Sequence, residues 1–192
     1  MGNQAWSDRV GNRSVSDRRR RVIKVLLHLS FREIQVHWNP TIISGGNLAA
    51  VLAIKAAQLQ PPIPLVFQLL IVPVTDNTAS VETYGSWAEN QLTPWLSPDR
   101  MLWFRNNYLP NQEDWTKWDA SPFLAPDDLV SKLPKKAWIG VTELDILRDE
   151  GIQYGAKLSK VGIEVEIDLY KGAPHRIMIM DGRSFIYIWD NS

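Results

Sequence analysis

The chain has 192 residues, 45% of them hydrophobic, and its 21 basic and 21 acidic side chains give a formal net charge of zero. This length and composition predict one domain with a substantial core, whereas the balanced charge provides no global field that would attract nucleic acid or an anionic membrane. The absence of cysteine excludes disulfides and thiolate chemistry, so we expect function to come from a local site that uses other side chains.

The first 24 residues differ in composition from the remainder. They are mostly polar, include four consecutive arginines at positions 18–21 and lack apolar periodicity, so we expect a disordered basic tail at 1–24 and a domain at 25–192. Runs of arginine also occur in nuclear-import and nucleic-acid-binding segments, but a solvated tail is the more common reason for them. No secretory signal is evident, and no apolar stretch reaches the roughly 18 residues of a membrane span. We therefore expect a cytoplasmic protein without a membrane span.

From position 44 onward, helix-like and strand-like segments alternate. Asn47–Gln60 is rich in alanine and leucine and ends before two prolines, which predicts a buried helix with small residues that pack closely on a sheet. Largely apolar runs of strand length follow at Leu65–Val74, Ala137–Val141 and Val165–Tyr170. This alternation predicts an α/β fold with a mostly parallel sheet, and we expect a fourth strand somewhere between positions 22 and 36.

Two further helices have clear boundary signals. Ser97 provides an N-cap before a proline and an aspartate, which predicts a helix over Asp99–Tyr108. Another helix is predicted over Ile152–Val161, because two carboxylates precede it and Gly162 follows it. Aromatic side chains concentrate around the first of these helices, where they either line an apolar pocket or fill the space between short helices; we favour packing. They are Trp87, Trp95, Trp103, Phe104, Tyr108, Trp115 and Trp118.

Three polar side chains follow one another in the order nucleophile, acid, base: Ser44, Asp145 and His175. Asp145 follows the strand Ala137–Val141 and His175 follows Val165–Tyr170, so a parallel sheet would bring both to the same edge. In serine hydrolases the histidine takes the hydroxyl proton, while a buried carboxylate holds the histidine in the required tautomer. Taken singly, Asp145 is better explained as an ordinary loop carboxylate and His175 as a partly buried histidine after a turn.

The sequence around these residues resembles the hormone-sensitive-lipase-like carboxylesterases of the α/β-hydrolase superfamily, from position 46 to position 182. Gly-Gly-Asn at 45–47 resembles the end of the family's Gly-Asp-Ser-Ala-Gly-Gly-Asn nucleophile motif, and residues 145–151 resemble its Asp-Pro-Leu-Arg-Asp-Glu-Gly motif. Residues 72–76 and 121–122 resemble two more segments of the family, each beside a strand. The resemblance implies that Asp145 is the catalytic acid and that His175 is the base.

The chain departs from the family pattern at the nucleophile. Alignment on Gly-Gly-Asn places Ile43 where the family has its serine, and Ser44 follows one residue later. An alkyl group cannot attack an ester, and a shift of one residue at a helix start turns a side chain by about 100°. Ser44 would serve only if the turn were rebuilt. The family's upstream His-Gly-Gly-Gly loop, which donates oxyanion-hole N–H groups, also has no counterpart. The resemblance therefore implies a carboxylic ester hydrolase with impaired activity.

The first strands of the family have no evident counterpart before Ser44, so we expect a partial α/β-hydrolase fold. A non-catalytic ligand-binding or protein-interaction domain on the same scaffold is the alternative function. The expected ligand is a small apolar ester or a similar molecule, and three histidines without paired spacing predict neither a metal nor a cofactor. An open sheet edge predicts self-association. The run Phe185–Trp189 is predicted to be strand-like, where the family has its final helix.

Overall fold

The computed structural model describes residues 41–176, and the side chains of residues 46–176. The chain divides into two units, Met1–Asn39 and Pro40–Ser192, and every described residue lies in the second unit. The predicted tail at 1–24, the strand predicted between 22 and 36 and the strand-like run Phe185–Trp189 lie outside the described residues. These expectations, and the domain boundary at position 25, stay predictions.

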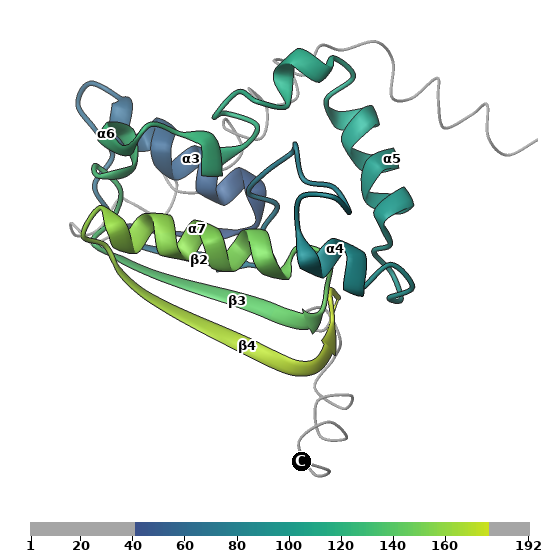
Figure 1. Cartoon of the computed structure of the whole chain (residues 1–192). Coiled ribbons are helices and arrows are strands. Elements are labelled where there is room, and N and C mark those ends of the chain that lie inside the picture. Colours follow the sequence, from purple (N-terminus) through teal and green to yellow (C-terminus); the bar gives the residue numbers. More distant parts are fainter. Residues whose placement is uncertain (1–40, 177–192) are drawn as a thin grey trace, which may run out of the picture. The chain divides into compact units, whose positions relative to one another are not determined.

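The described residues form a four-stranded parallel sheet with the strands in chain order (Figure 1). Its strands are β1 (Thr41–Gly45), β2 (Leu65–Ile71), β3 (Lys136–Leu144) and β4 (Glu164–Pro174). Parallel neighbours need crossover connections, which α3 (Asn47–Gln58) provides after β1 and α7 (Arg148–Lys160) after β3. The α/β class and the mostly parallel sheet are confirmed.

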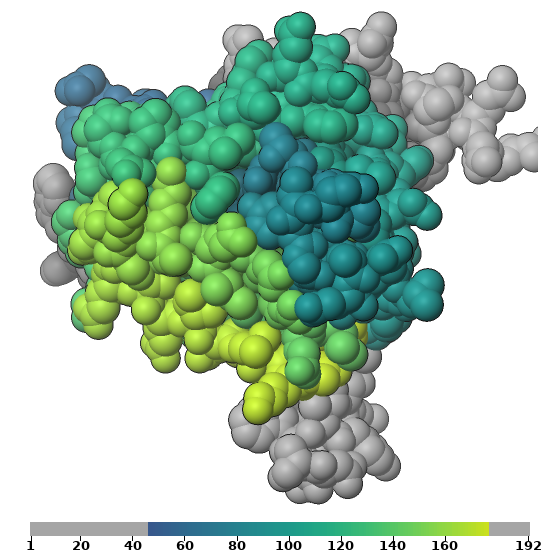
Figure 2. Space-filling model, in the orientation of Figure 1, coloured from purple at the N-terminus to yellow at the C-terminus, as the bar shows by residue number. Residues whose placement is uncertain are grey.

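A long connection joins β2 to β3 and contains five helical segments. In chain order these are α4 (Gly85–Glu89), α5 (Pro98–Tyr108), η1 (Gln112–Asp114), η2 (Pro122–Leu124) and α6 (Asp127–Val130). Ser97 caps α5 as predicted, since its hydroxyl accepts a hydrogen bond from the backbone N–H of Arg100. Figure 2 shows the segment that carries α4 and α5 on the same face as α7 and β4.

Several boundaries differ from the prediction for identifiable reasons. β1 was not predicted, because its five residues are too few to show a period. β2 ends at Ile71 rather than at Val74, since Val72 has a φ of 38° and Pro73 follows. α7 begins at Arg148, four residues before the predicted start at position 152. It ends as predicted before Gly162, which has a φ of 84°.

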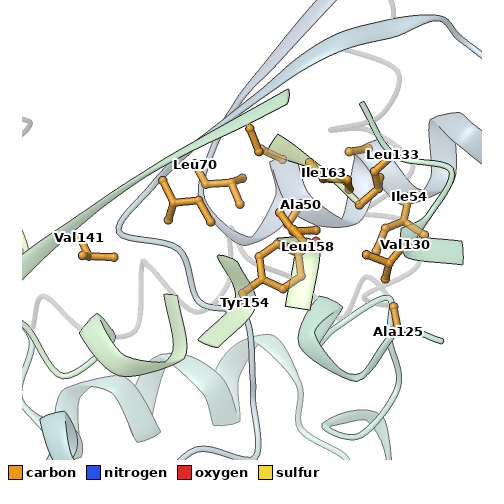
Figure 3. Packing of buried hydrophobic residues seen from close by; sticks show 14 residues of the cluster. Ala50, Ile54, Leu70, Ala125, Val130, Leu133, Val141, Tyr154, Leu158 and Ile163 are labelled. Carbon is orange, nitrogen blue, oxygen red and sulfur yellow. The ribbon is translucent and has the colours of Figure 1, made fainter. Parts of the chain in front are cut away.

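The core lies between the sheet and the two crossover helices, which cover the same side of it (Figures 1 and 3). The alanines at 49, 50 and 53 of α3 are buried, which confirms the predicted close packing. α7 approaches the sheet closely at Gly155, where an added Cβ would lie 2.7 Å from Ile167 Cδ1. Leu70, Ile139, Tyr154 and Leu158 are fully buried between these elements. The sheet is thereby fixed against α3 and α7.

No helix within residues 41–176 is both long and apolar enough to cross a membrane. Apolar side chains with large exposed fractions include Val66 at 44% and Leu169 at 45%, on β2 and β4. The predicted self-association stays a prediction.

Candidate active site

The acid and the base expected from the sequence meet at one edge of the sheet. Asp145 directly follows β3, and His175 directly follows β4, the neighbouring strand. His175 Nδ1 lies 2.8 Å from Asp145 Oδ2, within hydrogen-bonding distance. The Asp145 side chain is 1% exposed and that of His175 is 24% exposed. A buried carboxylate therefore contacts Nδ1 of a histidine whose ring is still partly accessible.

The Asp145 carboxylate is fixed by neighbours besides the histidine. Its Oδ1 accepts a hydrogen bond from the Leu147 backbone N–H at 3.0 Å, and Thr142 Oγ1 lies 3.3 Å from Oδ2. The backbone carbonyl of Asp145 accepts a hydrogen bond from Asn90 Nδ2 at 3.2 Å. Both the carboxylate and the backbone that presents it are therefore anchored, as an orienting acid requires.

The candidate nucleophile, Ser44, lies on β1 opposite Leu69 of β2. Only Gly46 separates this strand from α3, which begins at Asn47, so the chain makes the sharp strand-to-helix turn on which such a site depends. Side chains are described only from position 46 onward, so the structure gives no side-chain contact for Ile43 or Ser44. The structure brings Asp145 and His175 together. The role of Ser44 stays a prediction.

A cavity of about 280 Å³ opens beside His175. Most of its wall is apolar, and four polar residues besides the histidine contribute to it. The full lining is Asn47, Val74, Asn77, Leu96, Met101, Phe104, Arg105, Tyr108, Leu147 and His175. Because this cavity contains the candidate base, it is the natural place for a ligand of the Asp145–His175 pair.

The aromatic side chains divide between packing and the cavity. Trp87 is 1% exposed and packs in a buried cluster, as predicted. Phe104 and Tyr108 line the cavity, so the packing interpretation was wrong for these two. Trp103 is 61% exposed, and neither interpretation describes it.

Asn47 links the β1–α3 turn to the cavity wall. Its Nδ2 donates hydrogen bonds to the backbone carbonyls of Val74 and Ala120, each at 2.8 Å. This side chain was part of the quoted Gly-Gly-Asn motif, but no role was predicted for it. Its contacts join the start of α3 to the segment after β2 and to the segment before η2.

Glu150 is a buried carboxyl whose position the sequence did not predict. It is fully buried, and it accepts hydrogen bonds from the backbone N–H groups of Thr75 at 2.8 Å and Asp76 at 3.3 Å. Trp87 Nε1 donates to its other oxygen at 3.4 Å. Burial raises the pKa of Glu150 to about 8 despite these donors. The sequence predicted for Asp149 and Glu150 only an interaction with the helix dipole.

Arg105 is the second polar residue that the sequence did not single out. Its side chain is only 3% exposed, and burial lowers the pKa of its guanidinium. An arginine is mostly found at the surface, so the place of Arg105 in the sequence, between Phe104 and Tyr108, was the available signal. No cluster of three His, Asp or Glu residues that could hold a metal occurs within residues 41–176.

Comparison with known proteins gives a consistent picture. A family model described as the α/β hydrolase fold matches residues 44–179, about seven tenths of the chain. An AB hydrolase superfamily protein of Schizosaccharomyces pombe is 45% identical over 139 residues, which are 72% of this chain and 40% of that protein. Carboxylesterase NlhH of Mycobacterium tuberculosis is 38% identical over 125 residues, which are 65% of this chain and 38% of that protein.

Solved structures agree with the sequence relatives. A thermostable esterase from Pseudomonas putida matches with a TM-score of 0.69 and 34% identity, over 77% of this chain and 46% of that chain. The chain thus spans about 40% of the length of the curated relatives above. The family match begins at Ser44, directly after Ile43, the position that the sequence alignment gives to the nucleophile.

Proposed function

Because this chain belongs to the α/β-hydrolase fold family, we propose that it carries the acid and base of a carboxylic ester hydrolase on a scaffold with impaired turnover. The observation that carries the proposal is the 2.8 Å contact between Asp145 Oδ2 and His175 Nδ1. A carboxylate in this position holds the imidazole with a proton on Nδ1, so that Nε2 is free to accept a proton from a nucleophile.

The proposed impairment arises at the nucleophile. A hydroxyl must lie within hydrogen-bonding reach of His175 Nε2 to be activated. The family alignment gives this position to Ile43, whose alkyl side chain has no proton to transfer. Ser44 is the adjacent hydroxyl and the candidate replacement, but it is displaced by one residue along the chain.

Stabilisation of the tetrahedral intermediate is the second source of impairment. The negative oxygen of this intermediate requires preorganised N–H donors, and loss of a single donor commonly lowers the rate by about 10²–10³. No His-Gly-Gly-Gly sequence precedes Ser44 in this chain. We therefore expect little hydrolysis even where an ester binds beside His175.

The second candidate is a non-catalytic ligand-binding domain on the same scaffold. It is favoured by the cavity, because Val74, Leu96 and Met101 give the cavity an apolar wall that does not depend on the nucleophile. Such a cavity can bind a small ester or a similar molecule whether or not the ligand is cleaved. Both candidates therefore share a ligand class and differ in turnover.

Hydrolysis of short-chain p-nitrophenyl esters tests the proposal. We expect the native chain to be no faster than His175→Ala beyond about twofold, because neither variant has an activated nucleophile. Rapid hydrolysis that Ser44→Ala abolishes would contradict the impairment and identify Ser44 as the nucleophile. Labelling of Ser44 by a fluorophosphonate probe would lead to the same conclusion.

Ile43→Ser is the matched gain-of-function variant. It places a hydroxyl at the family position, so we expect an increase of about tenfold or more in fluorophosphonate labelling that depends on His175. The control Ile42→Ser introduces the same side chain one residue earlier and should not be labelled. Equal labelling of the two variants would show that position 43 has no special relation to His175.

A further inference from the structure

Arg105 is one of the residues that line the cavity beside His175. Its Nη1 donates a hydrogen bond to the carbonyl of Asn77, and its Nη2 donates to the carbonyl of Ala79 at 2.9 Å. Its Nε has no hydrogen-bond partner among the described residues. A buried cation is therefore held by neutral acceptors, and one of its donors is unused.

No carboxylate among the described side chains forms an ion pair with Arg105. Glu150 and Asp76 act on it only at longer range. Both oxygens of Asp76 already accept hydrogen bonds, from Thr78 and from the hydroxyl of Tyr84. Glu150 is bound by the N–H donors described above. The guanidinium of Arg105 therefore has no carboxylate within ion-pair distance among the described side chains, and Glu150 and Asp76 act on its charge only from farther away.

Two indole rings fix the orientation of this cation. The Arg105 guanidinium lies 4.7 Å from the ring centre of Trp115 and 5.6 Å from that of Trp87. Such cation–π contacts stabilise a guanidinium but do not neutralise its charge. A planar, fixed guanidinium is well suited to recognise a carboxylate, and an unpaired charge out of water gains more from an anion than a solvated charge does.

We propose that the cavity selects ligands that carry a carboxylate, with Arg105 as the group that recognises it. Together with the proposed ester chemistry, on which this substrate class rests, the ligands are half-esters of small dicarboxylic acids. Their ester group lies toward His175, their carboxylate lies toward Arg105, and their methylene groups contact the apolar wall at Val74 and Met101. Arg105 is then a specificity-determining residue and has no part in bond cleavage.

Binding of two matched esters to the native chain tests this proposal without any need for turnover. Monomethyl succinate carries the carboxylate, and methyl levulinate has a methyl ketone of nearly the same shape in its place. Ligand-observed NMR titration at pH 7 gives both dissociation constants. We expect monomethyl succinate to bind at least about tenfold more tightly, which corresponds to about 1.4 kcal/mol.

Three variants assign the preference to Arg105. Arg105→Met should bring the ratio of the two dissociation constants close to one, whereas Arg105→Lys should keep only part of the preference, because it keeps the charge but loses the planar guanidinium. Arg100→Gln is the control, since Arg100 is exposed and lies 5.9 Å from the ring of the cavity residue Phe104. It should leave the ratio unchanged. Circular dichroism reports whether each variant folds, and if Arg105→Met does not, the native chain and Arg105→Lys carry the test.

The outcomes separate this proposal from the proposed function. Equal dissociation constants in the native chain, absence of binding by both esters, or a ratio that Arg105→Met leaves unchanged would overturn the carboxylate preference. Each would indicate that Arg105 serves only to join α5 to the segment at 77–79. Rapid release of methanol from monomethyl succinate, abolished by Ser44→Ala, would instead contradict the impaired turnover while the binding preference stands.

Discussion

The carboxyl ends of β3 and β1 present candidate catalytic residues in different ways. After β3, backbone and side-chain donors hold Asp145. The segment that follows is bound to α4 through Ser86. The backbone N–H of Ser86 donates to the Asp149 carboxylate at 2.7 Å, and its hydroxyl donates to the Ile146 carbonyl at 2.6 Å. After β1, Gly46 precedes α3 without a side-chain cap, and Asn47 supplies the polar contacts.

The proposed function combines an anchored acid and base with an altered nucleophile, and this difference is compatible with that combination. None of the described contacts that position Asp145 comes from β1 or from α3. Intact geometry at Asp145 and His175 therefore carries no information about whether a nucleophile is present.

The largest expected effect comes from Glu150, the centre of the better-anchored region. Glu150→Ala removes the acceptor for the N–H groups of Thr75, Asp76 and Trp87 and leaves a cavity. We expect a loss of about 3–5 kcal/mol in the free energy of unfolding, measured by urea denaturation at pH 5.5. Glu150→Gln keeps the acceptor oxygen and should lose much less. Equal losses for the two variants would show that the acceptor oxygen that glutamine keeps contributes little to stability.

A pH dependence follows from the same side chain. The pKa of Glu150 rises from 4.5 to about 8 on folding, so the folded state binds more protons than the unfolded state between these values. Stability therefore decreases as the pH rises through this interval and becomes level above it, with a total change on the order of 5 kcal/mol.

Comparison with Glu150→Gln isolates this contribution, because the histidines and the other titratable groups near Glu150, namely Asp76, Tyr84 and Arg105, are the same in both proteins. The difference in unfolding free energy between the native chain and Glu150→Gln should change with pH between 5 and 8. A constant difference over this range would show that Glu150 is ionised in the folded state.

The sequence predicted those parts of the site that depend on chain order and on local signals. Asp145 and His175 were located because strands precede them and parallel strands end at one edge of a sheet. The helix over Asp99–Tyr108 was placed to within one residue because its cap is local. Both successes needed no knowledge of which side chains are buried.

The missed residues depend on tertiary burial, which local sequence does not encode. Glu150 and Arg105 carry charged groups that are mostly found in water, and each is buried only because segments distant in sequence surround it. Glu150 meets the turn after β2, and Arg105 meets the segment at 77–79. β1 was missed for a different reason, because five residues carry too little periodicity to separate a strand from a turn.

The smallest expected effect tests the less anchored region. Asn47→Ala removes two hydrogen bonds, to Val74 and to Ala120, while Ala120 keeps the hydrogen bond that Asn77 Nδ2 donates at 2.7 Å. Alanine is also a better helix former than asparagine. We therefore expect a loss of about 1–2 kcal/mol in the free energy of unfolding, less than for Glu150→Ala. Gln58→Ala, at the exposed end of the same helix, should change stability by less than about 0.5 kcal/mol. If Asn47→Ala were as destabilising as Glu150→Ala, the β1–α3 turn would be as firmly anchored as the loop at Asp145. The contrast drawn between the two regions would then be wrong.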